Sequence, residues 1–425
     1  MYSWGPGIQS LHDDGDDRDV GSSPERGALV PSDARLGGAN KAALSVSMSS
    51  SHSAVSTVRG WAYACGSNDC GQVDPARRDE DVIVRPSRVL EFSQAKVWRV
   101  GCGVNHTAAV TAGGTVLTWG SNEYGQCGHR VPFGKKPEDL PQTFCGPLAL
   151  ALTGGRRAES VACGHGFTLI LTTRMEVLAC GIAEIAGVDP DARGGAVTKE
   201  GEEGGGNSGP RCRRTAAPLP TLENLPIVSV SAGHRHAAVL TAHGAALAWG
   251  INGPDGRCGR PYPPVLSTPS PMRVPSTKMV VPDGSPTPFP NWARWEVETK
   301  GGGGSGDGNV VAAMPPVSLA DDVAVTHVAC GGKHTVLVTK AGGLLVCGAN
   351  DEGQLGLPPP ASEEDGAPHS SSVSPAVPVA HPSSAAEEDG GRRTFVSAEA
   401  GEAHTLLLDD AGDVWQMDGS GEGGK

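Results

Sequence analysis

Two cysteine–histidine pairs with the same spacing are the residues of this sequence that most resemble metal ligands. Cys102 precedes His106 by four positions, and Cys330 precedes His334 by the same step. Thiolate and imidazole groups bind structural zinc, but such a site needs four ligands that converge on one point. Whether two pairs can converge depends on the elements that carry them, and those elements are set by the surrounding sequence.

The two pairs belong to two copies of one repeated stretch. Residues 102–128 align with residues 330–356 without a gap. Weaker copies begin at Ser49, Cys163, Ala232 and Ala400. In five of the six copies the step from the histidine, or from Phe167 in its place, to a later glycine is 14 residues, as from His106 to Gly120, whereas the spacing between copies varies. A constant unit separated by variable segments predicts a repeat architecture with tolerant loops.

Most copies place the same residue types at equivalent positions, with a few exchanges. Phe167 replaces the histidine in one copy, and Trp and Cys interchange before the closing glycine. An unpartnered Trp-Gly pair also stands near the first residue. The repeat positions are Trp4, Gly5, Gly66, His106, Trp119, Gly120, Gly181, His236, Trp249, Gly250, His334, Gly348 and His404. Because these positions tolerate such exchanges, we interpret them as packing and loop-forming residues, and we expect each closing glycine to allow positive φ or a close backbone approach.

The same comparison argues against a metal site or a catalytic site. Two of the copies keep the histidine and lose the cysteine, and each pair belongs to a different unit. We therefore predict no zinc, and we expect the histidine to satisfy a backbone group in its own turn. The glycine-rich run at 301–308 lacks the Lys-Ser/Thr of a phosphate-binding loop. No catalytic, metal-binding or cofactor-binding residue is predicted.

The composition of each unit predicts two β-strands and a tight turn. Residues 106–110 and 115–120 are rich in Val, Thr and Ala, and residues 111–114 contain two glycines. Continuous apolar character indicates strands that are buried on both faces. Such units must stack, which predicts an all-β fold, a β-propeller of six or seven blades. We expect residues 1–425 to form a single repeat propeller.

Segments between the units are expected to be flexible. Gly, Pro, Ser and acidic residues dominate these segments, which leaves too little apolar surface for packing. The predicted flexible insertions are residues 10–45, 193–214, 260–310 and 358–393.

Charge and cysteine content limit the class of protein. The net charge is −13, but residues 13–19 and 361–393 hold 11 acids and 3 bases, which leaves 36 acids and 31 bases elsewhere. This balance argues against general nucleic-acid binding, although it leaves room for a basic patch on one face. Six of the 11 cysteines occupy repeat positions, which indicates free, buried thiols in a reducing compartment. Without a signal peptide or a long apolar run, we expect a cytoplasmic or nuclear protein with no membrane partner.

The repeated motif resembles the regulator of chromosome condensation repeat family. Its opening, Trp/Cys-Gly-Ser/Ala-Asn-x-x-Gly-Gln, occurs at residues 65–75, 119–129 and 347–357. Its ending, Cys/Ala-Gly-x-x-His-Thr with small variations, occurs at residues 100–111, 230–241 and 328–339. The resemblance implies a seven-bladed propeller of four-stranded blades. The founding member is a guanine-nucleotide exchange factor for the GTPase Ran that also docks on nucleosomes, and other members are interaction modules.

Two functions from different classes agree with the resemblance. The first is a non-enzymatic scaffold that binds protein partners through loops on one face. The alternative is a guanine-nucleotide exchange factor for a Ran-like small GTPase. The tryptophans of the family's ultraviolet-B photoreceptor are absent, because their places hold Val104-Asn105, Arg235 and Gly332-Lys333. We expect a protein partner, with a small GTPase as one candidate and the nucleosome as another, and neither a cofactor nor a small-molecule substrate.

Overall fold

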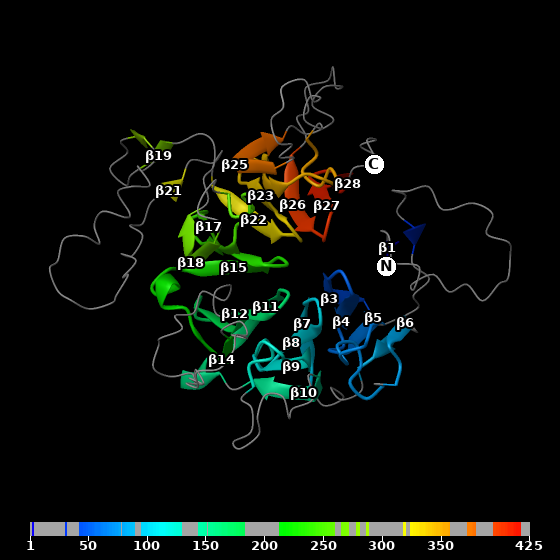
Figure 1. Cartoon of the computed structure of the whole chain (residues 1–425). Coiled ribbons are helices and arrows are strands. Elements are labelled where there is room, and N and C mark those ends of the chain that lie inside the picture. Colours follow the sequence, from blue (N-terminus) through cyan, green and yellow to red (C-terminus); the bar gives the residue numbers. More distant parts are fainter. Residues whose placement is uncertain are drawn as a thin grey trace, which may run out of the picture. The chain divides into compact units, whose positions relative to one another are not determined.

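The computed structural model is built almost entirely of β-strands, which are grouped into small antiparallel sheets (Figure 1). It describes residues 2–3, 30–31, 42–77, 79–89, 95–129, 143–150, 152–182, 212–259, 265–271, 278–280, 286–288, 318–319, 324–357, 372–379 and 394–417. The chain divides into two compact units. Unit 1 comprises chiefly Met1–Arg174 and Leu178–Ala217, and unit 2 comprises Met175–Val177 and Pro218–Gly419.

Within its described residues, unit 1 contains three four-stranded sheets whose strands lie side by side in chain order. The first sheet consists of β3 (Ala43–Met48), β4 (His52–Thr57), β5 (Ala62–Ser67) and β6 (Val82–Arg88). The second consists of β7 (Val97–Cys102), β8 (His106–Thr111), β9 (Val116–Ser121) and β10 (Thr143–Leu150). The third consists of β11 (Ala158–Cys163), β12 (Phe167–Thr172), β13 (Val177–Ile182) and β14 (Cys212–Pro218). A short pair, β1 (Tyr2–Ser3) and β2 (Val30–Pro31), lies near the N-terminus in sequence.

Unit 2 repeats this plan. One sheet consists of β15 (Ile227–Ala232), β16 (His236–Thr241), β17 (Ala246–Ile251) and β18 (Val265–Pro271). Another consists of β22 (Val325–Cys330), β23 (His334–Thr339), β24 (Leu344–Ala349) and β25 (Ser372–Val379). The described part of the last repeat has three strands, β26 (Phe395–Ala400), β27 (Thr405–Asp409) and β28 (Val414–Met417). A separate sheet holds β19 (Lys278–Val280), β20 (Pro286–Pro288) and β21 (Ser318–Leu319).

The middle strands of each sheet form the core. All residues are buried in the strands β12, β16, β23 and β24, as the continuous apolar pattern predicted. Trp119 in β9 is 1% exposed and packs in a cluster with residues of the neighbouring sheet, including Ala54. The hairpin between β8 and β9 turns at Gly114, which has a φ of +79° that favours glycine.

A β-bulge recurs at the second residue of the first strand in each repeated sheet. In β7 the pairing with β8 shifts between Val97 and Arg99, so that Trp98 is the extra residue. The bulge residues are Leu44, Trp98, Glu159, Val228, Thr326 and Val396, and all are exposed. A bulge leaves the extra residue unpaired and redirects its side chain, which explains how apolar residues at this position remain exposed.

Strands that the sequence pattern did not predict lie within the segments expected to be flexible. β3 and β14 overlap the ends of 10–45 and 193–214, and β18 and β25 lie within 260–310 and 358–393. The expectation was therefore wrong for these strands. Strand β25 contains two prolines, which hide a strand in the sequence pattern but are tolerated at a sheet edge. Among the described strands, β25 pairs with β24 alone. Strand β2 also lies within 10–45, and β19 and β20 lie within 260–310. Apart from these strands and Ala42, the remaining residues of these segments lie outside the described part of the chain.

Candidate functional site

The repeated histidine connects two sheets instead of closing its own turn. The Nε2 atom of His106, at the start of β8, lies 2.8 Å from the Oγ1 atom of Thr168 in β12. The Thr168 hydroxyl donates to the carbonyl oxygen of Gln126 at 2.8 Å. Because the hydroxyl proton is used in that bond, Nε2 of His106 must be the donor to Thr168. This corrects the expectation that the histidine satisfies a backbone group in its own turn.

The same relay of histidine, threonine and carbonyl recurs in the other repeats. Its members are His52, Thr107 and Gln72 (2.7 and 2.6 Å), His236, Thr335 and Arg257 (2.8 and 2.7 Å), and His334, Thr405 and Gln354 (2.9 and 2.7 Å). The repeat that carries Phe167 in place of histidine is followed by the repeat that carries Ala237 in place of threonine. This joint loss is the sequence signal from which the pairing between repeats could have been predicted.

Glycines beside each relay are required by space and by backbone conformation. A Cβ atom on Gly103 would lie 2.4 Å from Cε1 of His106, and one on Gly401 would lie 2.3 Å from Cε1 of His404. Gly120 has a φ of +97°, and its Cβ would lie 2.8 Å from Cα of His106. The equivalent glycines Gly66, Gly181, Gly250 and Gly348 have φ between +111° and +119°. Trp119 and Trp249 are buried beside these glycines, whereas Trp4 and Gly5 lie outside the described residues.

The cysteine and histidine of each candidate metal pair face different neighbours. Cys102 donates its thiol to the carbonyl of Ser47 in β3 at 3.3 Å, whereas His106 contacts Thr168 in β12. Burial raises the pKa of the Cys102 thiol and lowers the pKa of His106 to about 3. The ten cysteines whose side chains the structure describes are free. Among the described residues, no group of three or more His, Cys, Asp or Glu side chains is arranged to hold a metal ion.

The Asn and Gln of the repeated motif fold the loop that follows the third strand of the repeat. In the loop after β9, Oδ1 of Asn122 accepts from the amide of Cys127 at 2.9 Å, and Oε1 of Gln126 accepts from the amide of Tyr124 at 2.9 Å. Asn350 and Gln354 make the same contacts in the loop after β24. These side chains satisfy buried amides, so the motif serves loop structure and holds each loop in one conformation.

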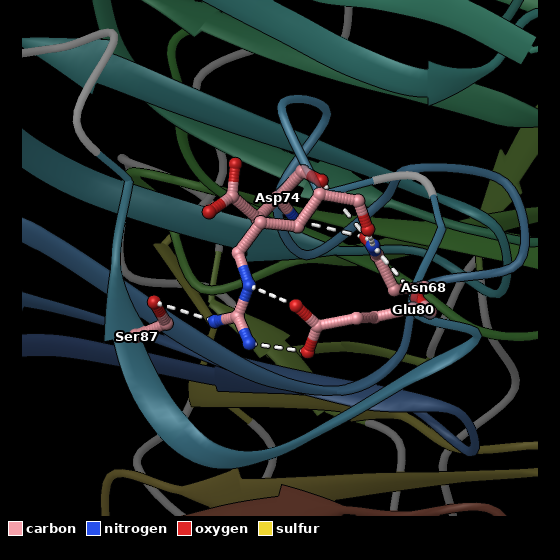
Figure 2. A network of polar contacts seen from close by, with 5 residues as sticks. Asn68, Asp74, Glu80 and Ser87 are labelled. Atoms are coloured by element: carbon pink, nitrogen blue, oxygen red, sulfur yellow. Dashed lines mark hydrogen bonds and ion pairs between the residues drawn. The ribbon is translucent and has the colours of Figure 1, made fainter.

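A network of polar contacts also holds the loop between β5 and β6 (Figure 2). Nδ2 of Asn68 donates to the carbonyl oxygens of Asp74, Arg77 and Glu80, at 3.2, 2.8 and 3.1 Å. The Arg77 guanidinium forms an ion pair with Glu80 and donates to Ser87 Oγ in β6 at 3.2 Å. The long loop is therefore fastened both to itself and to the sheet.

Exposed carboxylates lie on the loops after β5 and β9, and we call this set the acidic loop surface. It consists of Asp69, Asp79, Asp81 and Glu123, all of which are exposed. Hydrogen bonds from Gln72, Ser67 and the Cys70 amide lower the pKa of Asp69, with Gln72 contributing most. The Cys70 thiol has a pKa raised first by burial and then by the charges of Asp69 and Glu123, which places both carboxylates near it.

Parts of the chain match a known repeat, and known proteins are similar to it in sequence. The regulator of chromosome condensation (RCC1) repeat matches residues 113–171 and 341–408, and a second description of it matches residues 99–126, 227–259 and 325–354. The mouse secretion-regulating guanine nucleotide exchange factor is 31% identical over 319 residues, which cover 71% of this chain and 63% of that protein. The Arabidopsis thaliana ultraviolet-B receptor UVR8 is 24% identical over 309 residues, which cover 72% of this chain and 53% of the receptor. The chain thus spans less than two thirds of the length of these relatives.

Solved structures with this fold include human WBSCR16 and yeast RCC1 (Prp20) bound to Kap60. The first has a TM-score of 0.61 at 17% identity and covers 89% of this chain and 77% of its own. The second has a TM-score of 0.57 at 16% identity and covers 88% of this chain and 69% of its own. No helix in the described part of this chain is long and apolar enough to cross a membrane. The matched segments show that the chain carries regulator of chromosome condensation repeats, and the repeated sheets and these structures show that it has the β-propeller fold.

Proposed function

We propose that this chain is a non-enzymatic scaffold, a single propeller, that binds a protein partner through the loops at one end of its sheets. The acidic loop surface carries the proposal. Asp69, Asp79, Asp81 and Glu123 are exposed on loops that Asn and Gln side chains already hold in place. A loop that is ordered before binding loses little conformational entropy on association, so its contacts contribute more fully to affinity.

The charge of this surface selects the kind of partner. Glu80 is balanced by Arg77, whereas Asp79 and Asp81 stand exposed beside that pair. Carboxylates on a rigid surface attract a partner with a complementary basic face and speed its association. A protein with exposed Lys and Arg side chains fits this surface, in the cytoplasm or in the nucleus.

Affinity capture from cell extract, with mass spectrometry of the bound proteins, tests the proposal. The Asp79→Lys variant reverses one charge of the acidic loop surface, and the Glu223→Lys variant reverses one exposed charge elsewhere. We expect one set of proteins to be captured by the unmodified chain and by Glu223→Lys, and to be lost with Asp79→Lys. Equal capture by all three chains would show that the acidic loop surface is not the binding site.

A second candidate function is guanine-nucleotide exchange, which the similarity to the mouse secretion-regulating exchange factor favours. An exchange factor inserts protein groups beside a bound nucleotide and needs no substrate pocket of its own. Release of labelled GDP from a Ran-type GTPase, with catalytic amounts of this chain, measures the activity. Acceleration of about a thousandfold, or about 4 kcal/mol of the barrier, would establish exchange as the principal function.

A further inference from the structure

The opposite end of the sheets in unit 1 has the opposite charge. The hairpin turns that join the second and third strands lie at this end, because successive connections of an antiparallel sheet alternate between its two ends. The basic residues of these turns, and of the segments that lead into β7 and β11 or end β6, are Arg59, Arg88, Lys96, Arg156, Arg157 and Arg174. We call this set the basic turn surface.

Direct contacts show that the basic turn surface is continuous. The turn at Gly60 touches Lys96, since a Cβ on Gly60 would lie 2.8 Å from Cα of Lys96. The carbonyl of Lys96 accepts from the amide of Ala112 at 2.7 Å in the next hairpin turn. That turn contacts Arg157, whose side chain donates from Nε to the carbonyl of Gly113 at 2.9 Å.

The basic turn surface continues to the hairpin turn between β12 and β13. The carbonyl of Arg157 accepts from the amide of Thr173 at 2.9 Å, which places Arg174 next on this surface. Lys96, Arg157 and Arg174 are exposed, and within the described part of the chain they form no ion pair with a carboxylate. The carboxylates nearest to this surface in sequence are Glu159 and Glu176. The surface therefore keeps a net positive charge along three consecutive sheets.

Aromatic side chains accompany this charge. Trp98 is the bulge residue of β7, two positions after Lys96, and is 49% exposed. Two guanidinium groups lie over the ring of Trp61, with Cζ of Arg88 at 4.2 Å and Cζ of Arg59 at 5.5 Å from the ring centroid. An arginine side chain that lies over an aromatic ring is held in a fixed orientation, so these contacts keep positive charge at this surface.

We propose that the basic turn surface binds single-stranded nucleic acid. Phosphates contact Lys96, Arg157 and Arg174, and an unpaired base stacks on Trp98. Single strands are bound by this combination of a cationic track with an aromatic platform, because every base has a face that can stack. A duplex has its bases stacked and lacks free base faces, whereas a single strand offers them to the exposed indole of Trp98. This site lies away from the acidic loop surface, so it is independent of the proposed protein partner.

Fluorescence anisotropy of the full chain with labelled homopolymers of uridine and of thymidine, about 20 nucleotides long, tests the proposal. We expect binding that weakens with salt and exceeds binding to a duplex of the same length. Trp98→Ala should weaken binding by about fivefold or more, whereas Val228→Ala, at the matching bulge position of β15, should not change it.

A matched pair of charge reversals tests the phosphate contacts. The Lys96→Glu/Arg174→Glu double variant should weaken binding and flatten its salt dependence. The Arg235→Glu/Lys333→Glu variant makes the same change of charge at exposed residues of unit 2, and should bind as the unmodified chain does. Equal affinity for duplex and single strand, an unchanged Trp98→Ala variant, or binding only to phosphatidylserine vesicles would overturn the proposal.

Discussion

His106 in β8 and Thr168 in β12 are joined by a hydrogen bond of 2.8 Å between two fully buried side chains. The hydroxyl of Thr168 also donates a hydrogen bond to the carbonyl of Gln126, so that it binds two partners. The relay therefore ties two neighbouring sheets of unit 1 to the loop that follows β9. Without this hydroxyl, the imidazole of His106 and the carbonyl of Gln126 would stay buried and each would lose a hydrogen-bond partner.

Replacing Thr168 by valine keeps the shape of the side chain and removes its hydroxyl. Because Nε2 of His106 and the carbonyl of Gln126 then lose this partner, we expect the free energy of unfolding to fall by about 1–3 kcal/mol. Urea denaturation measures the change. Thr115→Val, at an exposed turn position, is the control and should change stability by less than about 0.5 kcal/mol. Equal losses in the two variants would contradict the structural role of the relay.

The buried histidines predict that the fold loses stability in acid. Burial lowers the pKa of His106, His236 and His334 to about 3, and that of His52 to about 4, from a usual value of 6.5. Between those values the unfolded chain binds more protons than the folded chain. Stability is therefore complete above pH 6.5 and falls as the pH drops toward 4, by up to about 1.4 kcal/mol per histidine and pH unit.

Unfolding free energies in urea at pH 7.5, 6 and 5 test this expectation. The His106→Gln variant should show a smaller dependence on pH, because one titrating group is removed. His327→Gln replaces an exposed histidine and should keep the full dependence. A stability that is the same at pH 7.5 and pH 5 would show that the buried histidines do not remain neutral in the folded chain.

Gly103 lies against the imidazole ring of His106, and we expect this position to tolerate no side chain. In Gly103→Ala the new Cβ would lie 2.4 Å from Cε1 of His106 and 2.5 Å from the carbonyl oxygen of Gly164. We expect a loss of about 1–3 kcal/mol, because neither the ring nor the backbone has room to move. Gly113→Ala is the matched control, since its nearest neighbour is 3.6 Å away. Thermal melting of the two variants tests this, and we expect a lower melting temperature for Gly103→Ala than for Gly113→Ala. Similar melting temperatures would contradict the prediction.

Metal content should be negligible in the purified protein. Cys102 and His106 each have a hydrogen-bond partner in a different sheet, so the pair does not converge on one point. We expect no stoichiometric zinc by elemental mass spectrometry and no change in melting temperature with a chelator. One zinc ion per chain that disappears in Cys102→Ser would show that our assignment of these residues is wrong.

Local pattern made much of this fold predictable. The fixed step between His106 and Gly120 reflects one hairpin, in which the two residues lie opposite each other in β8 and β9. Runs of Val, Leu and Thr predict buried strands, and paired glycines predict the turn, because both depend on neighbours in sequence. The family resemblance rests on the same local motifs. The sequence also predicted a structural role for the histidine with a backbone partner in its own turn, whereas the structure pairs His106 with Thr168.

The amino-acid sequence by itself determined the repeat, the strand type and the residues that must be glycine. The tertiary structure decided which residues meet across sheets: Thr168 as the partner of His106, and Lys96 beside the turn at Gly60. It also decided that a bulge exposes Trp98 and that acidic and basic groups occupy opposite ends of the sheets in unit 1. These relationships arise when separate repeats stack, and periodicity within one repeat carries no information about which side chain of the next repeat lies against it.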